Sequence, residues 1–172
     1  MRSTIALLSL LASCTSLTPA GAGADHAALR ATIEELYTAF SFDAHAEPDW
    51  ARQRELYLEG ATFVAPIQPG QAPVGDDTET FLDEFQAFVR RGPYAETGLY
   101  ERILDVDAGI CGNIAHAFVL FEGHYPGDPE AQTRGLDSLQ FVRDGQAWRL
   151  VSFTTQYESE GAPLELVFKS SN

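Results

Sequence analysis

The second half of the chain constrains the fold most, because every segment after Thr97 has the residue pattern of β-strands. Strands are predicted over 99–107, 114–125, 134–143 and 146–157. Asp144-Gly145 separates the last two as a two-residue hairpin turn. Successive strands joined by short turns form an antiparallel sheet. Such a sheet needs helices to cover at least one of its faces.

The first half of the chain predicts two of these helices. Asp25 is placed to cap the first, whose apolar residues fall on one face at helical spacing: Leu29, Ile33, Leu36, Tyr37 and Phe40. Asp49 begins a shorter second helix, which Gly60 ends. A strand over 61–66 follows.

A third helix completes the expected architecture. Asp76 and Glu79 have the spacing of a capping box at its start, and Gly92-Pro93 closes it. Its apolar face is formed by Phe81, Leu82, Phe85, Phe88 and Val89. Three helices cannot cover both faces of the sheet, so we expect them on one face, with sheet twist curving around them. The predicted class is α+β, a curved antiparallel sheet packed against three helices.

Residues 1–24 have the pattern of a secretory signal segment, with one basic residue and a short apolar run that cannot span a bilayer. Two ends of this segment are predicted. Leu11-Ala12-Ser13-Cys14 resembles a lipobox, in which Cys14 would be lipidated, whereas Ala22-Gly23-Ala24 resembles an ordinary signal peptidase site. We therefore expect an exported protein, either periplasmic or secreted, or anchored to the membrane through a lipid on Cys14.

Composition and motifs exclude several classes of function. The formal net charge of -14 repels nucleic acid and anionic lipid headgroups. No metal site and no cofactor are expected, because the sequence has no glycine-rich phosphate loop and its histidines show no metal-binding spacing: His26, His45, His116 and His124. Cys111 lies in an apolar strand, which predicts a buried and inert side chain.

The order of these elements over 25–157 resembles the nuclear transport factor 2-like (NTF2-like, or SnoaL-like) superfamily. The similarity rests on Tyr37-Thr38-Ala39-Phe40, on Asp49-Trp50 leading into Ala61-Thr62-Phe63, and on the closing hairpin over 138–150. Gly112 to Phe118, with Glu122 further on, resembles an uncharacterised bacterial subgroup. The remaining residues, 158–172, are a C-terminal tail that is expected to dock or to add a last strand.

This resemblance implies a cone-shaped fold with a pocket between the concave sheet face and the helices. It also implies homodimers that form through the sheet. Members of the superfamily include ketosteroid isomerases, scytalone dehydratases, polyketide cyclases and epoxide hydrolases. Their catalytic residues do not match this sequence one by one, so the resemblance assigns no catalytic residue.

The closing hairpin predicts which side chains face the helices. With Asp144-Gly145 as its loop, six residues share the more apolar face: Phe141 paired with Trp148, Leu139 with Leu150, and Asp137 with Ser152. Asp137 would then lie among aromatic side chains, where desolvation raises the pKa of a carboxyl group and suits it to general acid or base catalysis. The alternative is a solvated aspartate at the rim of the sheet.

His116 is the predicted catalytic partner of Asp137, because neighbouring strands carry the two residues. The alternatives are that His116 faces solvent on the convex side or is hydrogen-bonded in the core. Five residues are predicted to bind a ligand, from the helices above the pocket or from the sheet: Tyr37, Trp50, Phe118, Glu122 and Trp148.

The sequence is compatible with three functions. The first is the binding of a small apolar or mixed organic ligand in the cone, without catalysis. The second is acid–base chemistry on a small organic substrate, such as isomerisation, dehydration or hydrolysis, with Asp137 and His116 as acid and base. The third is a dimeric scaffold module at the cell envelope that uses the outer sheet face as its interface.

Overall fold

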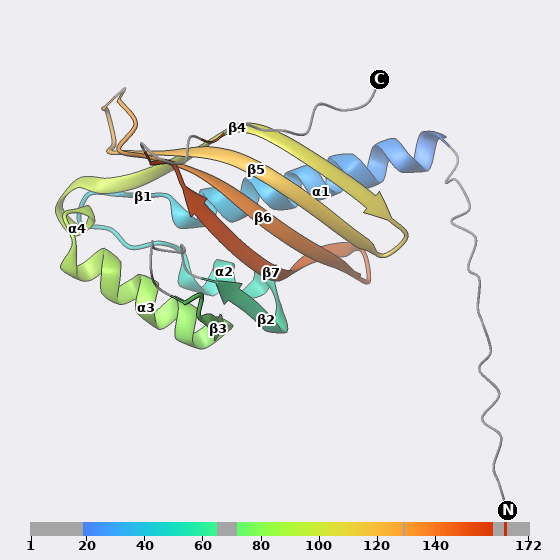
Figure 1. Cartoon of the computed structure of the whole chain (residues 1–172), viewed down its shortest axis with the longest axis horizontal. Helices are drawn as coiled ribbons and strands as arrows, with labels where there is room; N and C mark the ends of the chain where they lie inside the picture. The colour runs from blue at the N-terminus through green and yellow to red at the C-terminus, as the bar shows by residue number, and fades with distance from the viewer. Residues whose placement is uncertain (1–18, 65–71, 129, 160–163, 165–172) are drawn as a thin grey trace, which may run out of the picture.

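The chain forms each helix and strand that the sequence predicts, together with three additional short elements, β1, β3 and α4 (Figure 1). The second helix ends at Leu56 and not at Gly60, which lies inside the strand that follows. The computed structural model describes residues 19–64, 72–128, 130–159 and 164. The elements run in this order: α1 Pro19–Phe40, β1 Phe42–Asp43, α2 Trp50–Leu56, β2 Tyr57–Val64, β3 Gly75–Asp77, α3 Thr78–Arg91, α4 Tyr94–Thr97, β4 Gly98–Cys111, β5 Ile114–His124, β6 Thr133–Asp144 and β7 Ala147–Tyr157.

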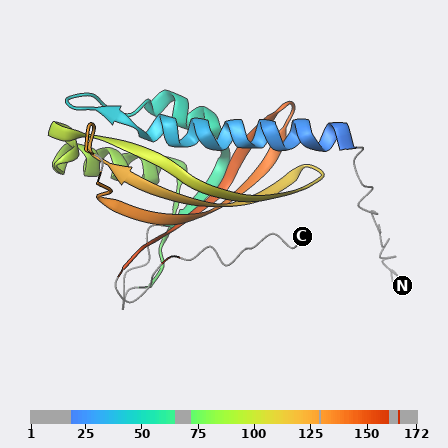
Figure 2. The same ribbon diagram turned by 90° about the horizontal axis from the view of Figure 1, so that it is seen from above.

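The strands form one seven-stranded sheet in the order β1-β4-β5-β6-β7-β2-β3. All neighbours are antiparallel except β2 and β7, which run parallel. The sheet curves, and α1, α2 and α3 lie on the same side of it (Figure 2). These observations confirm the predicted α+β class, a mostly antiparallel sheet packed against helices.

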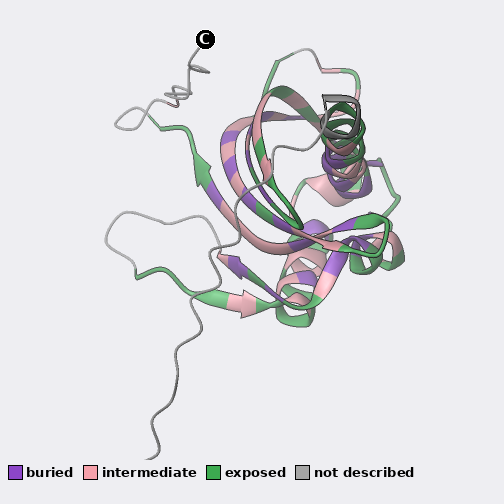
Figure 3. Ribbon diagram, turned by 90° about the vertical axis from the view of Figure 1, so that its right-hand side faces the viewer, coloured by how far each residue is buried: buried purple, intermediate pink, exposed green. Residues whose placement is uncertain are grey.

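The hydrophobic core lies between the concave face of the sheet and the helices (Figure 3). On β5 the alternating residues Ala115, Ala117, Val119 and Phe121 are buried and face this core. Leu29, Ile33, Leu36 and Phe40 of α1 are buried against them, as the helical spacing predicts. The residues between them on β5, such as His116, therefore belong to the convex face.

Helix α1 begins at Pro19, so Asp25 lies inside the helix and does not cap it, contrary to the prediction. The helix begins this early because proline suits the first position of a helix. The residues that follow Pro19 are also rich in alanine, which has a high helix propensity. The Asp25 carboxylate instead pairs with the Arg143 guanidinium at 2.8 Å and ties α1 to the end of β6. Cys14 and the rest of 1–18 lie outside the described residues, as do 160–163 and 165–172 of the tail.

Helix α3 is capped one residue later than the sequence predicts. The Asp77 side chain accepts a hydrogen bond of 2.8 Å from the Thr80 backbone N–H. Asp76 pairs with Phe63 in the short β3–β2 ladder, so its backbone is already engaged. At the other end the prediction is confirmed, because Gly92 follows the last helical residue and its N–H donates to the Phe88 carbonyl at 2.9 Å.

The N-cap assignment gives a direct stability test. Asp77→Ala should lower the free energy of unfolding by about 1 kcal/mol, because the Thr80 N–H loses its acceptor at the helix terminus. The matched variant Asp76→Ala should leave it nearly unchanged. Urea denaturation of both variants checks the assignment, and a larger loss for Asp76→Ala would contradict it.

The closing hairpin differs from the prediction in register. Asp144 pairs with Ala147, so the loop is Gly145-Gln146, with Gly145 at a φ of 61°. Glycine at the first central position with positive φ is the arrangement of a type II′ turn, which matches strand twist. The two strands are therefore paired two residues away from the predicted register. A shift of two residues keeps each side chain on the same face of its strand, so Trp148 and Leu150 still face the core.

A second irregularity follows further along the same hairpin. The register shifts by one residue between Phe141 and Gln140, because β7 contains a β-bulge at this point. The bulge places Phe153 opposite Leu139 and Thr155 opposite Asp137, so the predicted pairing of Asp137 with Ser152 is wrong. Because a one-residue shift exchanges the two faces of a strand, Thr155 now faces inward beside Asp137.

Candidate functional site

A cavity of about 360 Å³ lies between the concave face of the sheet and α3. Aromatic rings form much of its wall: Phe40, Phe81, Phe85, Phe88, Phe121, Phe153 and Tyr157. Phe81, Phe85 and Phe88 come from successive turns of α3, whose apolar stripe faces the sheet. The volume and the predominantly apolar wall are those of a small-molecule site.

Asp137 on β6 lies at the sheet side of this cavity and is 1% exposed. Its Oδ2 accepts a hydrogen bond of 2.5 Å from the Tyr37 hydroxyl on α1. Its Oδ1 accepts one of 2.7 Å from the Thr155 hydroxyl on β7. The two donors hold the carboxyl group from both sides. Thr155 reaches it because of the bulge in β7, and Tyr37 reaches it because it lies on the inward face of α1.

The pKa of Asp137 reflects two opposing influences. Burial raises it from the ordinary aspartate range to about 7, although the hydrogen bonds from Tyr37 and Thr155 lower it. The pKa of Tyr37 is raised well above its usual value by burial and by the adjacent Asp137 charge, so its hydroxyl remains a neutral donor. A carboxyl group that titrates near neutrality can either donate or accept a proton.

Glu101 on β4 provides a second carboxyl group at the same cavity. Burial, with a smaller contribution from the charge of Asp137, raises the pKa of Glu101 to about 8. Its backbone N–H donates to the Ser41 hydroxyl at 3.0 Å, and Ser41 donates in turn to the Tyr37 carbonyl at 2.9 Å. Within the described part of the chain, no hydrogen bond or ion pair engages the Glu101 side chain.

Glu101 and Thr155 are the site residues that sequence analysis missed. A usable signal existed for Glu101, which alternates with Leu99 and Ile103 on the inward face of its strand. A glutamate in the register of two apolar residues indicates a desolvated carboxyl group. No local pattern could place Thr155, because its orientation depends on the bulge.

The predicted contact between His116 and Asp137 is wrong. Val119 of β5 pairs directly with Asp137, and His116 lies three residues from Val119, so it faces the opposite side of the sheet. His116 pairs with Gln140 and its Nε2 lies 3.1 Å from the Ser138 hydroxyl. The histidine is exposed on the convex face, as one of the alternatives above anticipated.

The five predicted ligand-binding residues do not line the cavity. Phe118 and Glu122 share the convex face with His116, and Glu122 pairs with the Arg102 guanidinium at 2.7 Å. Trp148 is a core residue that is 2% exposed. Trp50 packs its ring edge-to-face against Phe85, a residue of the cavity wall, at 5.8 Å between centroids. Tyr37 acts through its hydrogen bond to Asp137.

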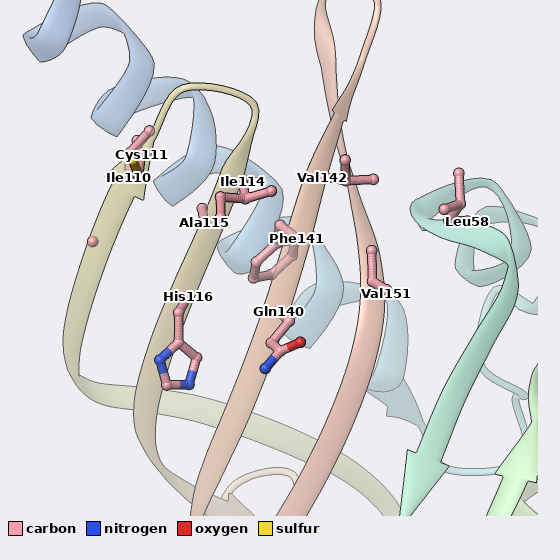
Figure 4. Close-up of a pocket in the computed structure, with 11 residues that line it drawn as sticks. Leu58, Ile110, Cys111, Ile114, Ala115, His116, Gln140, Phe141, Val142 and Val151 are labelled. Carbon is pink, nitrogen blue, oxygen red and sulfur yellow. The ribbon is translucent and has the colours of Figure 1, made fainter. Parts of the chain in front are cut away.

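A second hollow lies on the convex face at the end of the sheet near the hairpin turns, with a volume of about 670 Å³ (Figure 4). Its wall is mostly aliphatic, and His116 and Gln140 are its polar side chains. Cys111 at its margin is exposed, so the prediction of a buried thiol is wrong. Cys111 lies at the end of β4, where it pairs with Ile114 of β5, and the Ile114 side chain is also exposed, at 61%. The described lining of this hollow contains no carboxyl group, lysine or arginine, so the inner cavity is the stronger candidate.

Among the described residues, no group of three or more histidine, cysteine, aspartate or glutamate side chains is arranged to hold a metal ion. None of the helices in this part of the chain is long and apolar enough to cross a membrane.

Comparisons with known proteins define the fold. No family model matches the sequence, and no curated protein matches it. Among solved structures, an NTF2-like protein of unknown function from Pseudomonas putida aligns with a TM-score of 0.63 at 13% identity, covering 86% of this chain and 97% of its own. One of unknown function from Silicibacter pomeroyi aligns with a TM-score of 0.53 at 22% identity, covering 80% and 98%.

A third structural neighbour, from Streptomyces avermitilis, is described as a putative dehydratase from the NTF2-like family. It aligns with a TM-score of 0.61 at 14% identity and covers 80% of this chain and 99% of its own. The chain therefore has the NTF2-like fold, as the sequence resemblance predicts. Identities this low define the fold and leave the chemistry to the site.

Proposed function

We propose that the inner cavity binds a small, largely apolar organic molecule. The observation that carries this proposal is a cavity of about 360 Å³ with an aromatic wall and a buried, hydrogen-bonded carboxyl group at its sheet side. The aromatic wall supplies binding energy through apolar burial, while Asp137 and Glu101 provide polar contacts that orient the ligand. The outer hollow has no comparable combination.

Titration with 2-phenylethanol, followed by amide chemical shifts, tests the site. We expect the shifts to concentrate on β4, β6, β7 and α3 around the cavity. Val64→Phe should weaken binding, because Val64 lines the cavity and the larger side chain fills it. The matched change Val151→Phe enlarges a residue of the outer hollow and should leave binding unchanged. The reverse ranking of the two variants would refute the proposal.

A second candidate, acid–base catalysis on the bound molecule, is favoured by one specific observation. Asp137 and Glu101 border the same cavity and titrate near neutrality, with pKa values of about 7 and about 8. One carboxylate could remove a proton from a carbon next to a carbonyl group, while a protonated carboxyl group donates to an oxygen. Isomerisation and dehydration, the reaction named for the Streptomyces neighbour, can both proceed this way.

Hydrogen–deuterium exchange at the α-carbon of a small cyclic enone in D₂O measures this step. The protein should accelerate the exchange, and Asp137→Asn or Glu101→Gln should lower the acceleration by about 100-fold or more. His116→Ala serves as the control and should have no effect, because His116 faces the opposite side of the sheet. Exchange no faster than in buffer, or unchanged in both carboxyl variants, would refute the catalytic candidate.

A further inference from the structure

The residues that line the inner cavity carry charge of only one sign. Four of them are carboxylic acids, Asp76, Glu84, Glu101 and Asp137, and the described lining contains no lysine, arginine or histidine. Burial next to apolar rings makes an uncompensated negative charge costly, so the ionised cavity favours a positive partner. An anionic ligand would meet repulsion from the ionised carboxylates of the wall.

Two arginines of the neighbouring helices form ion pairs with glutamates outside the cavity lining. Arg54 of α2 pairs with Glu79 at 2.9 Å, and Arg90 of α3 pairs with Glu47 at 2.8 Å. Glu101, in contrast, has no side-chain hydrogen bond or ion pair within the described residues. Among the described residues, this position of the cavity wall therefore carries a carboxyl group without a basic partner.

The aromatic wall adds a second, independent preference for a cation. Phe81 and Phe85 lie nearly parallel, at 5° with centroids 6.1 Å apart, and the Phe40 ring meets Phe85 edge-on at 5.2 Å. Phe81 also stacks on Phe63 at 4.2 Å and 6°, which fixes its orientation. The negative face of an aromatic ring attracts an ammonium group, and the attraction grows when water is excluded.

We propose that the cavity selects small organic cations, meaning protonated or quaternary amines that carry an apolar body. The ammonium group would lie near Glu101 and Asp137, and the apolar body would pack against the phenylalanine rings. This inference rests on the proposed function, because it names the ligand class of the same cavity. It adds to the proposed function the prediction that the cavity discriminates by charge among molecules of equal size.

The pH dependence follows from the groups that face the cavity. Ionisation of Asp137 and Glu101, with pKa values of about 7 and about 8, supplies the negative charge that attracts the amine. The other titratable groups of the wall are Asp76 on β3, Glu84 on α3 and Tyr157 on β7, and Tyr37 on α1 contacts Asp137. Affinity for the amine should therefore increase as the pH rises through 7 and 8.

Three ligands that share one ring and differ in charge test the selection on the full chain: 2-phenylethylamine, 2-phenylethanol and phenylacetate. Calorimetric titration should give an affinity about tenfold higher for the amine than for the alcohol, and no binding of the carboxylate. If the alcohol binds as tightly as the amine, cation selection is refuted while the cavity remains a binding site. If none of the three binds, the proposed function fails as well.

Variants of single carboxyl groups locate the effect. Glu101→Gln should reduce the amine affinity to that of the alcohol and leave the alcohol affinity unchanged, and Asp137→Asn should act in the same direction. Glu59→Gln is the matched control, since it makes the same charge change at an exposed position on β2 outside the cavity lining. Equal losses in Glu59→Gln and Glu101→Gln would attribute the preference to net charge and overturn the proposal.

Discussion

The free energy of unfolding should fall as the pH rises through 7, and Asp137→Asn should remove much of this decline. The pKa of Asp137 is about 7 in the folded protein, against an ordinary aspartate value in the unfolded chain. Between these two values the folded protein holds a proton that the unfolded chain has released. The stabilisation is therefore complete below the unfolded pKa and is lost as the pH rises through the folded one.

The expected size of this effect makes it measurable. A shift from the ordinary value to about 7 corresponds to at most about 4 kcal/mol across the window. Glu101 adds a decline of the same sign as the pH rises through 8, because its pKa is also raised in the folded state. Asparagine cannot ionise, so the variant should retain only the part of the slope that Glu101 and other groups contribute.

Urea unfolding at about pH 5 and about pH 9 measures how far the free energy of unfolding declines in the parent protein and in Asp137→Asn. Asp105→Asn provides the control, because Asp105 is exposed on β4 and the substitution removes the same charged group. This control should keep the slope of the parent protein. A parent protein whose stability does not decline over this range, or an Asp137→Asn variant with the same slope, would contradict the raised pKa.

The sequence was sufficient for the features that depend on local periodicity. The alternation over 114–125 and the helical stripe from Leu29 to Phe40 place the correct residues in the core. Asp137 was also predicted to face the helices, and it does so together with four of the five other residues assigned to that face: Leu139, Phe141, Trp148 and Leu150. These predictions survive small errors, since a shift of two residues leaves the faces of a strand unchanged.

The features that sequence analysis missed depend on single-residue shifts or on contacts between distant elements. The register slip and the bulge in β7 together put Thr155 in place of Ser152 beside Asp137, and no turn residue marks the bulge in the sequence. His116 was assigned to the wrong face because neighbouring strands alone do not determine which residues lie opposite. The Tyr37 hydroxyl reaches Asp137 across 100 residues of chain, which no spacing rule predicts.

Gly98→Ala should destabilise the protein by about 3 kcal/mol or more. Gly98 has a φ of 75°, a backbone conformation that is strained for a residue with a Cβ atom. An added Cβ would also lie 2.6 Å from the Phe42 carbonyl oxygen and 2.7 Å from the Asp43 carbonyl carbon. Both atoms belong to the backbone of β1, so no side-chain rotation can relieve the contact.

Ligand binding in the inner cavity should weaken in this variant along with the stability of the fold. Gly98 pairs with Asp43 in the β1–β4 ladder, three residues before Glu101, whose N–H is held by Ser41. Displacing β1 would loosen this link between α1 and β4, so binding of 2-phenylethylamine should weaken even where the variant remains folded.

Gly109→Ala separates the specific clash from the general effect of adding a methyl group to β4. A Cβ at Gly109 meets no heavy atom within 4 Å, and its φ is not positive. Its stability should therefore stay within about 0.5 kcal/mol of the parent protein. Thermal and urea unfolding of the two variants should rank Gly98→Ala far below Gly109→Ala. Equal losses would mean that β1 does not hold the start of β4 against α1, and that Glu101 is positioned by the sheet alone.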